Sequence, residues 1–186
     1  NPFKGAGKFF AGDLVNYETD ENGVNPKVYI LKTFKVVSAA GTVVNILRDG
    51  YKHVPCVGDK IGVAPATIGG SMTAVTITAV AKSVVSGKDV WACTTSGELT
   101  ASENDILVEA DDSNKMLVKN INAVCPTDLD MFDAPAADDN DFDGARYSYT
   151  PALGGIMYTN RMSPIPACVK KLNQSKVNGW FQIQSV

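Results

Sequence analysis

The sequence contains one histidine, His53, in 186 residues. A mechanism that needs a histidine base, or several histidine metal ligands, would depend on this single residue, so most hydrolase templates are excluded. The four cysteines lie far apart and form no C-x-x-C pair of the kind that binds zinc or serves a redox motif. Separate buried thiols are expected, and a disulfide pair is the alternative, because spacing does not decide between them.

Long apolar runs and an excess of basic residues are also missing. The most apolar stretch, Met72 to Val85, contains Lys82 and several Thr and Ser residues, and it is shorter than the ~18 residues of a membrane span. Lys and Arg number 17 against 20 Asp and Glu, so the chain lacks the basic excess of a nucleic-acid binder. The sequence predicts neither a membrane span nor specific binding to nucleic acid.

Strand patterns dominate what is present. No window of eleven or more residues carries the i, i+3, i+4, i+7 stripe of an amphipathic helix. Short β-branched or aromatic runs alternate instead with Gly, Asn and Asp turns. The predicted strands in the first two thirds of the chain are 13–17, 28–31, 34–37, 42–47, 60–63, 72–80, 89–94, 106–108 and 116–118.

These patterns predict a mainly β fold, in which short antiparallel strands form a small barrel or sandwich. Residues 1–124 are expected to form this domain, either as one body or as two small β modules. Residues 125–144 are an acidic, Pro/Ala-rich loop, long enough to be a contact surface. Residues 145–186 are an aromatic-rich β segment or arm that packs on the domain or on a partner. Its predicted elements are strands at 145–149, 156–159 and 180–183, and a strand or helical turn at 169–172.

A short motif recurs at a constant spacing of 46 positions, at Asp13, Asp59 and Asp105. Each aspartate follows a Gly or Asn and directly precedes an apolar strand. Small antiparallel barrels use a turn-capping aspartate of this kind at their corners. The motif therefore indicates shared turn geometry, with a true duplication as the alternative.

The best candidate for covalent chemistry is the trio His53, Cys56 and Asp59, which could supply a base, a thiol and an orienting carboxylate. A strand-and-turn context with Pro55 between them gives no reason for their side chains to converge. A histidine at the end of a hairpin and a core thiol are favoured, and a small Cys/His hydrolase is the weaker alternative. The chain is therefore predicted to be no enzyme, without catalytic residues or a bound cofactor.

The acidic loop contains one pattern with metal-ligand spacing. Asp139, Asp141 and Asp143 occupy positions 1, 3 and 5, and Gly144 occupies position 6, as at the start of a calcium loop. Position 12 is Thr150 in place of the usual glutamate, so the closing half of the loop is absent. A solvated acidic loop is the preferred interpretation. Docking against a basic partner surface and a bound calcium ion are the alternatives.

Aromatic residues raise a further alternative. Trp91 and Trp180, with Tyr147, Tyr149 and Tyr158, could form a platform on which a sugar or a base stacks. Packing in a core or an interface is the commoner use of aromatic residues on strands. A carbohydrate-binding β module is nevertheless the main competing function.

Several stretches of the chain are similar to a known group of proteins. They are Val28 to Val36, Arg48 to Pro55, Val57 to Ile61, Asp105 to Ala110, Tyr149 to Gly155, Arg161 to Pro164, Leu172 to Val177 and Gly179 to Phe181. Over roughly Leu14 to Ile183, the chain resembles virion structural proteins of tailed bacteriophages and prophages from gut bacteria, described as head fibre, auxiliary capsid or head-associated proteins. These motifs include no catalytic signature.

The resemblance implies a part of the virion that is assembled in the cytoplasm of the host bacterium. Its partners would be the phage capsid or other virion proteins, together with further copies of the same chain. The role would be capsid decoration, an auxiliary capsid function or the anchoring of a head fibre. The residues predicted to contact partners are Asp138, Asp139, Asp141, Asp143, Tyr147, Tyr149, Tyr158, Trp180 and Phe181.

Overall fold

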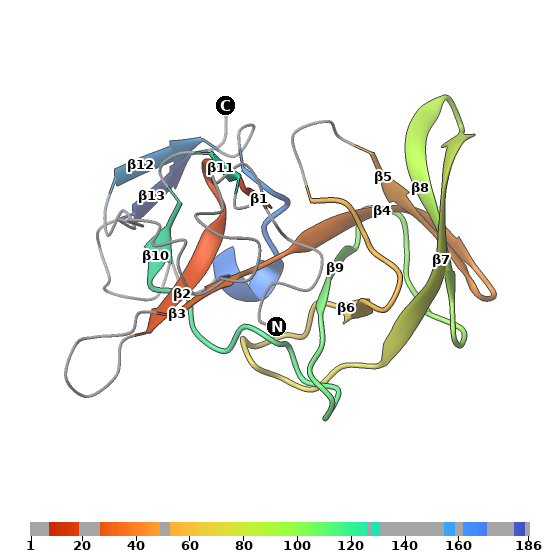
Figure 1. The fold of residues 1–186 in the computed structure, drawn as a ribbon, viewed down its shortest axis with the longest axis horizontal. Coiled ribbons are helices and arrows are strands. Elements are labelled where there is room, and N and C mark those ends of the chain that lie inside the picture. Colours follow the sequence, from red (N-terminus) through yellow and green to blue (C-terminus); the bar gives the residue numbers. More distant parts are fainter. Residues whose placement is uncertain are drawn as a thin grey trace, which may run out of the picture.

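The computed structural model describes residues 8–18, 27–48, 53–125, 128–130, 155–158, 162–170 and 181–184. These residues are mostly strands joined by turns, with one short helical turn at 167–170 (Figure 1). The prediction of a mainly β fold is confirmed. The strands are β1 (Lys8–Phe9), β2 (Leu14–Glu18), β3 (Lys27–Ile30), β4 (Thr33–Ala40), β5 (Val43–Leu47), β6 (Lys60–Val63), β7 (Ala74–Val85), β8 (Lys88–Thr95), β9 (Ile106–Glu109), β10 (Ala123–Val124), β11 (Leu129–Asp130), β12 (Gly155–Tyr158) and β13 (Phe181–Gln184).

Six strands close into a ring in the order β4-β5-β8-β7-β6-β9, and every neighbouring pair is antiparallel. The ring lies on the right in Figure 1. Alternate side chains point inward, because successive residues of a strand face opposite sides of a sheet. The buried residues inside the ring are Phe34, Val36, Val44, Ile46, Ile61, Val75, Ile77, Cys93, Leu99 and Leu107.

The ring is built from two halves with the same internal plan, β9-β4-β5 and β6-β7-β8. The middle strand of each half carries a bulge at the matching place, between Val36 and Ser38 in β4 and between Ile77 and Ala79 in β7. The first strands of the two halves, β9 and β6, pair with each other, and so do the last strands, β5 and β8. An approximate two-fold axis therefore relates the halves.

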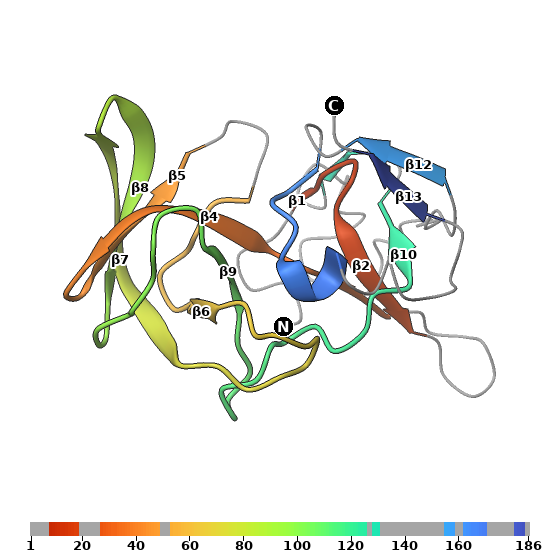
Figure 2. The same cartoon turned by 180° about the vertical axis from the view of Figure 1, so that it is seen from behind.

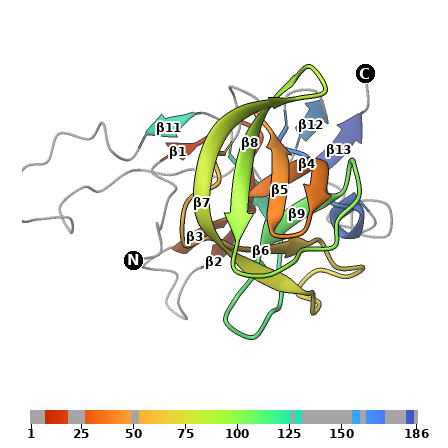
Figure 3. The ribbon, with the colours of Figure 1, turned by 90° about the vertical axis from the view of Figure 1, so that its right-hand side faces the viewer.

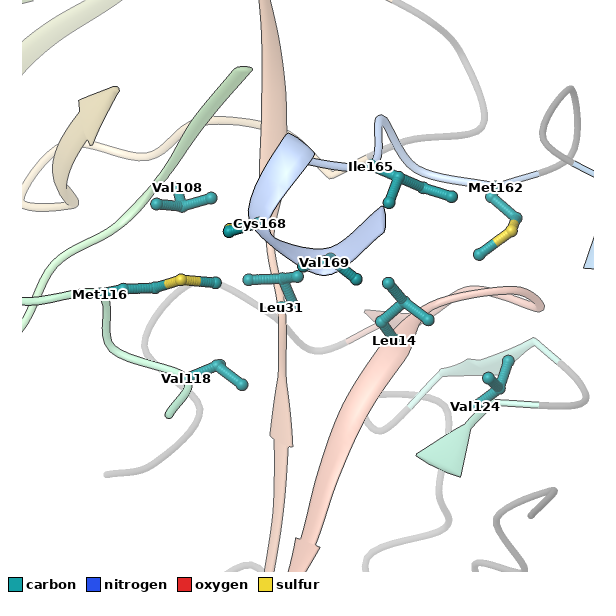
Figure 4. Packing of buried hydrophobic residues seen from close by; sticks show 10 residues of the cluster. All are labelled: Leu14, Leu31, Val108, Met116, Val118, Val124, Met162, Ile165, Cys168 and Val169. Atoms are coloured by element: carbon teal, nitrogen blue, oxygen red, sulfur yellow. The ribbon is translucent and has the colours of Figure 1, made fainter. Parts of the chain in front are cut away.

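A second unit lies beside the ring. It contains the sheet β10-β2-β3 and residues 162–170, whose helical turn lies against β2 in Figure 2. Figure 4 shows its core, in which Cys168 and Val169 face Leu14 and Leu31. The buried residues of this cluster are Leu14, Leu31, Val108, Met116, Val118, Val124, Met162, Ile165, Cys168 and Val169. Val108 belongs to β9, so the cluster also joins the second unit to the ring.

Two further strand pairs are described by their backbones. β1 pairs antiparallel with β11, which lies within the predicted acidic segment, and β12 pairs in parallel with β13. The first pair joins residues near the start of the chain to residues 129–130, and the second joins two segments of its C-terminal part.

The structure differs from the predicted strands in several places: β1, β10 and β11 were not predicted, and β4 runs three residues beyond its predicted end, to Ala40. β7 extends to Val85, five residues beyond the predicted end at Val80, because its far half pairs with β8 in a long hairpin. The predicted strand at 116–118 is wrong: a turn ending at Asn114 reverses the chain, and Met116 forms only an isolated bridge to Ala110. Met116 and Val118 are buried because they fill the core of the second unit.

Candidate functional site

The three aspartates of the recurring motif form the same turn. In each turn, the backbone N–H of the residue three positions earlier donates to the aspartate carboxylate, and the aspartate N–H donates back to that residue's carbonyl. The donors to Asp13, Asp59 and Asp105 are Phe10, Cys56 and Ser102, each at 2.8 Å. The residue before each aspartate has a left-handed backbone, with φ of 92° at Gly12, 94° at Gly58 and 71° at Asn104. Glycine and asparagine tolerate this conformation best.

The surroundings of the three turns repeat as well. The carbonyl of each aspartate accepts a hydrogen bond from a backbone N–H in or next to a neighbouring strand. The donors to Asp13, Asp59 and Asp105 are Cys125, Ile77 and Val36. The same three residues accept from the amide that precedes the aspartate. The prediction of shared turn geometry is therefore confirmed. The turn at Asp13 lies outside the ring, at the start of β2.

Asp13 differs from its two equivalents because it is the centre of a buried polar cluster. Its carboxylate is 1% exposed. One oxygen, Oδ2, lies 2.8 Å from His53 Nε2, and the other, Oδ1, accepts a hydrogen bond of 3.1 Å from Ser163 Oγ. The Phe10 ring packs against the imidazole in a T-shaped arrangement, with centroids 5.0 Å apart. Three distant segments of the chain thus meet at one carboxylate.

The order of these groups is not that of a nucleophilic triad. In a triad the histidine lies between the hydroxyl and the acid, so that it can remove the hydroxyl proton. Here the carboxylate of Asp13 lies between His53 and Ser163, and all three residues are buried. The arrangement holds segments together and supplies no activated serine.

A second buried pair joins the end of β9 to the β3–β4 connection. Lys32 Nζ lies 2.9 Å from Glu109 Oε1, and the side chains are 4% and 15% exposed. Burial alone would lower the pKa of Lys32, but the charges of Glu109 and the more distant Asp59 raise it overall. Burial raises the pKa of Glu109 despite the attraction of Lys32. The two pKa values are therefore raised for different reasons: burial acts on Glu109, and nearby negative charges act on Lys32.

The trio His53, Cys56 and Asp59 does not acquire the features of a catalytic thiol site. His53 is directed to Asp13, while the carboxylate of Asp59 accepts the backbone N–H of Cys56. Burial, and then the charge of Asp59, raise the pKa of the Cys56 thiol, whereas a reactive thiol needs a lowered pKa. The geometry gives the hydrolase hypothesis no support.

The structure records no disulfide at Cys56, Cys93, Cys125 or Cys168, and the last three are buried, in agreement with the prediction of separate thiols. Burial raises the pKa of Cys93 to about 12. This thiol lies inside the ring and remains protonated at neutral pH.

Trp91 is the one stacking candidate whose side chain the structure describes. It packs partly buried against the core of the ring, and the cations of Arg48 and Lys82 lie 5.7 and 5.8 Å from its ring centroid. This environment favours packing over a free stacking platform. Tyr158 and Phe181 lie on β12 and β13, where only the backbone is described. The other predicted residues lie outside the described residues: Asp138, Asp139, Asp141, Asp143, Tyr147, Tyr149 and Trp180.

Among the described residues, no group of three or more His, Cys, Asp or Glu side chains could hold a metal ion. The predicted calcium loop falls outside those ranges. No helix in the described part of the chain combines the length and the hydropathy of a membrane span.

Over part of its length, the outer edge of β7 has no strand partner among the described residues. β6 pairs with β7 only over Ala74–Thr76. Just beyond, the Gly58 N–H donates to the Ile77 carbonyl, and the Ile77 N–H donates to the Asp59 carbonyl. From Thr78 to Val85, β7 pairs with β8 alone among the described residues. This eight-residue edge resembles the edge strands on which other chains add.

The turn at the tip of this hairpin determines which backbone groups face outward. Ser86 and Gly87 both have positive φ, 50° and 74°, as in the two-residue type I′ turn. The pair Val85 and Lys88 next to such a turn exchanges backbone hydrogen bonds, and hydrogen-bonded pairs alternate along the ladder. The N–H and C=O groups of Val80, Lys82 and Val84 therefore point away from β8, toward the open edge.

Sequence reasoning missed the Asp13 cluster and the buried ion pair. The recurring motif singled out Asp13, but nothing near Ser163 or Lys32 in the sequence indicates their partners, which lie 150 and 77 positions away. Comparison with known proteins finds no match to this chain among protein families, curated proteins or solved structures.

Proposed function

We propose that this chain is a structural protein of a tailed-phage virion that associates with the capsid and acts by binding other proteins. The observation that carries the proposal is the open edge of β7. It adds to the resemblance of the sequence motifs to head fibre, auxiliary capsid and head-associated proteins.

An open edge binds a partner by adding a strand from it to the sheet. The partner's backbone satisfies the outward N–H and C=O groups of Val80, Lys82 and Val84, while side-chain contacts give specificity. Val84 is 64% exposed and offers an apolar contact beside this edge. Contacts that are weak singly become strong when many copies lie on one symmetric shell.

The polar clusters fit a binding role because they stabilise the fold without forming an activated nucleophile. Asp13 and Lys32 have buried partners that join the ring to the second unit. The acidic residues 138–143 and the aromatic residues of the C-terminal segment remain predicted partner contacts.

The test is binding of the full chain to purified phage capsids, followed by cosedimentation. Proline at position 82 lacks the outward N–H but leaves the β7–β8 hydrogen bonds in place, so Lys82→Pro is expected to lose binding. Lys82→Ala is the matched control, because it removes the charge and keeps the N–H. Binding that survives in a folded Lys82→Pro variant would contradict the role of the edge, and absence of wild-type binding to any capsid would contradict the virion assignment.

A further inference from the structure

The β7–β8 hairpin is longer than its counterpart in the other half of the ring, the β4–β5 hairpin. Val36 in β4 and Ile77 in β7 occupy equivalent places, because each exchanges two backbone hydrogen bonds with an aspartate turn. From there β4 continues for four residues to Ala40, whereas β7 continues for eight residues to Val85. Figure 3 shows β7 and β8 running side by side past the other ring strands to the turn at their tip. The added length of β7 lies within its open edge, which begins at Thr78.

Lys82 is the one charged residue of the open edge. Its side chain is exposed, and its ammonium lies 5.8 Å from the centroid of the Trp91 ring. Lys82 and Trp91 are paired across β7 and β8, so the attraction between the cation and the ring holds the ammonium on their side of the hairpin. The positive charge therefore lies beside the outward backbone groups of β7.

The other charged residues of the hairpin belong to ion pairs. On the side of Lys82, Asp89 lies 3.0 Å from Arg48. On the opposite side, Lys88 lies 3.0 Å from Glu103. Among the described residues, no ion pair includes Lys82. The open edge therefore presents a positive charge that no carboxylate of the described chain compensates.

Two valines flank Lys82 on the same side of β7, because alternate residues of a strand face the same way. Val84 is 64% exposed, and Val80 is half-buried. The residues between them, Ala81 and Ser83, are small and face the other side of the sheet. The side chains that can discriminate among incoming strands are therefore concentrated on the side of Lys82.

We propose that the open edge binds an extended partner segment that carries an aspartate or glutamate opposite Lys82 and apolar residues opposite Val80 and Val84. The inference deepens the edge contact of the proposed function and rests on it. Directly opposite residues of neighbouring strands have Cβ atoms about 5 Å apart, so their side chains can form an ion pair. Opposite charges in such a pair are stabilising, whereas like charges are destabilising.

The same charge disfavours binding of a second copy at this edge. Antiparallel pairing of two β7 strands about Lys82 would place their ammonium groups opposite each other. A lysine within an exposed edge is one of the features that prevent identical edges from pairing. Lys82 thus favours an acidic partner and opposes a basic one, including its own copy.

Binding of synthetic peptides to the full chain, measured by fluorescence anisotropy, tests this inference. The peptides alternate valine and threonine, and their central valine is replaced by glutamate, glutamine or lysine. The wild type is expected to bind the glutamate peptide roughly tenfold more tightly than the lysine peptide, with the glutamine peptide between them. Lys82→Glu should reverse this order. Lys170→Glu is the matched control: it makes the same change of net charge at an exposed residue of the second unit, and it should keep the wild-type order.

Two further variants separate the charge preference from the edge contact. Lys82→Ala keeps the edge and should bind the three peptides with similar affinity, whereas Lys82→Pro should bind none of them. Equal affinities in the wild type, or an order that Lys82→Glu leaves unchanged, would overturn the charge preference, and loss of binding in Lys82→Pro would still support the edge contact. Binding that persists in a folded Lys82→Pro variant, or a wild type that binds no peptide, would overturn both. Circular dichroism checks that each variant is folded, and cosedimentation with capsids tests the virion assignment separately.

Discussion

The ring and the second unit are built from the chain in different ways. The ring uses the continuous stretch from β4 to β9, and its six strands are joined by backbone ladders between antiparallel neighbours. The second unit collects β2, β3, β10 and residues 162–170, which are scattered over most of the sequence. Closing such distant loops costs more chain entropy than forming local hairpins.

This difference explains where the buried polar groups lie. Inside the ring, the clustered residues are apolar apart from a thiol, and the buried hydroxyl of Thr95 donates only to backbone carbonyls, those of Thr42 and Gly97. The polar ties occur where the second unit meets the ring: Asp13 with His53 and Ser163, and Lys32 with Glu109. Local strand pairing does not determine how these distant segments are arranged. Our hypothesis, which substitutions can test, is that the directional buried contacts select one arrangement.

The largest effect is expected from breaking the buried ion pair. Lys32→Met leaves the Glu109 carboxylate without its ammonium partner and should lower the free energy of unfolding by about 3–5 kcal/mol, measured by urea denaturation. The double variant Lys32→Met with Glu109→Leu should recover most of the loss, because it removes both charges.

An exposed ion pair provides the control for that experiment. Lys88 lies 3.0 Å from Glu103, with 48% and 57% of the side chains exposed, so Lys88→Met should change stability little. Equal losses from Lys32→Met and Lys88→Met would show that the junction between the units has no special role.

A smaller difference is expected between two equivalent turns. Asp13→Ala leaves buried donors from Phe10, His53 and Ser163 without their acceptor and should cost roughly 2–4 kcal/mol. Asp105→Ala removes the same turn bond at an exposed site and should cost about 1 kcal/mol. Urea denaturation of both variants measures the difference. Similar costs would mean that the ties to His53 and Ser163 contribute nothing.

The smallest effect concerns pH. Because the pKa of Glu109 is raised in the folded protein, the native state holds this proton to higher pH than the unfolded chain does. The contribution of Glu109 to stability is therefore fully present below its ordinary pKa, and it is lost as pH rises through the raised folded pKa. Glu109→Gln should remove this dependence, so the stability of the wild type relative to the variant should fall over that window. A difference that rises with pH would contradict the direction of the shift.

Much of the ring could be predicted from the sequence. The predicted strand at 60–63 coincides with β6, and the motif at Asp13, Asp59 and Asp105 predicts three equal turns. These features depend on alternation and on turn residues, which act within a few positions. The end of β7 was missed because Lys82 and Ser83 interrupt the apolar pattern, and pairing with β8 maintains the strand there.

The junction could not be predicted in the same way. Ser163 and Asp13 are ordinary polar residues in their local sequence, and their hydrogen bond spans 150 positions. Met116 and Val118 alternate with polar or exposed residues as in a strand. They are buried in the core of the second unit, but the nearby turn prevents a continuous strand from forming there. Packing between distant segments overrides local preference at such sites.

By itself, the sequence determines the β character of this protein, the positions of most ring strands and the three aspartate turns, because these features depend on side-chain period and on residues that tolerate positive φ. Only the tertiary structure decides that six strands close into a ring, that a second unit assembled from distant segments joins it, and that one edge of β7 is left without a strand partner among the described residues. The reason is physical: closure, burial and strand neighbours are properties of contacts between segments far apart in the chain, and no local pattern encodes which segments meet.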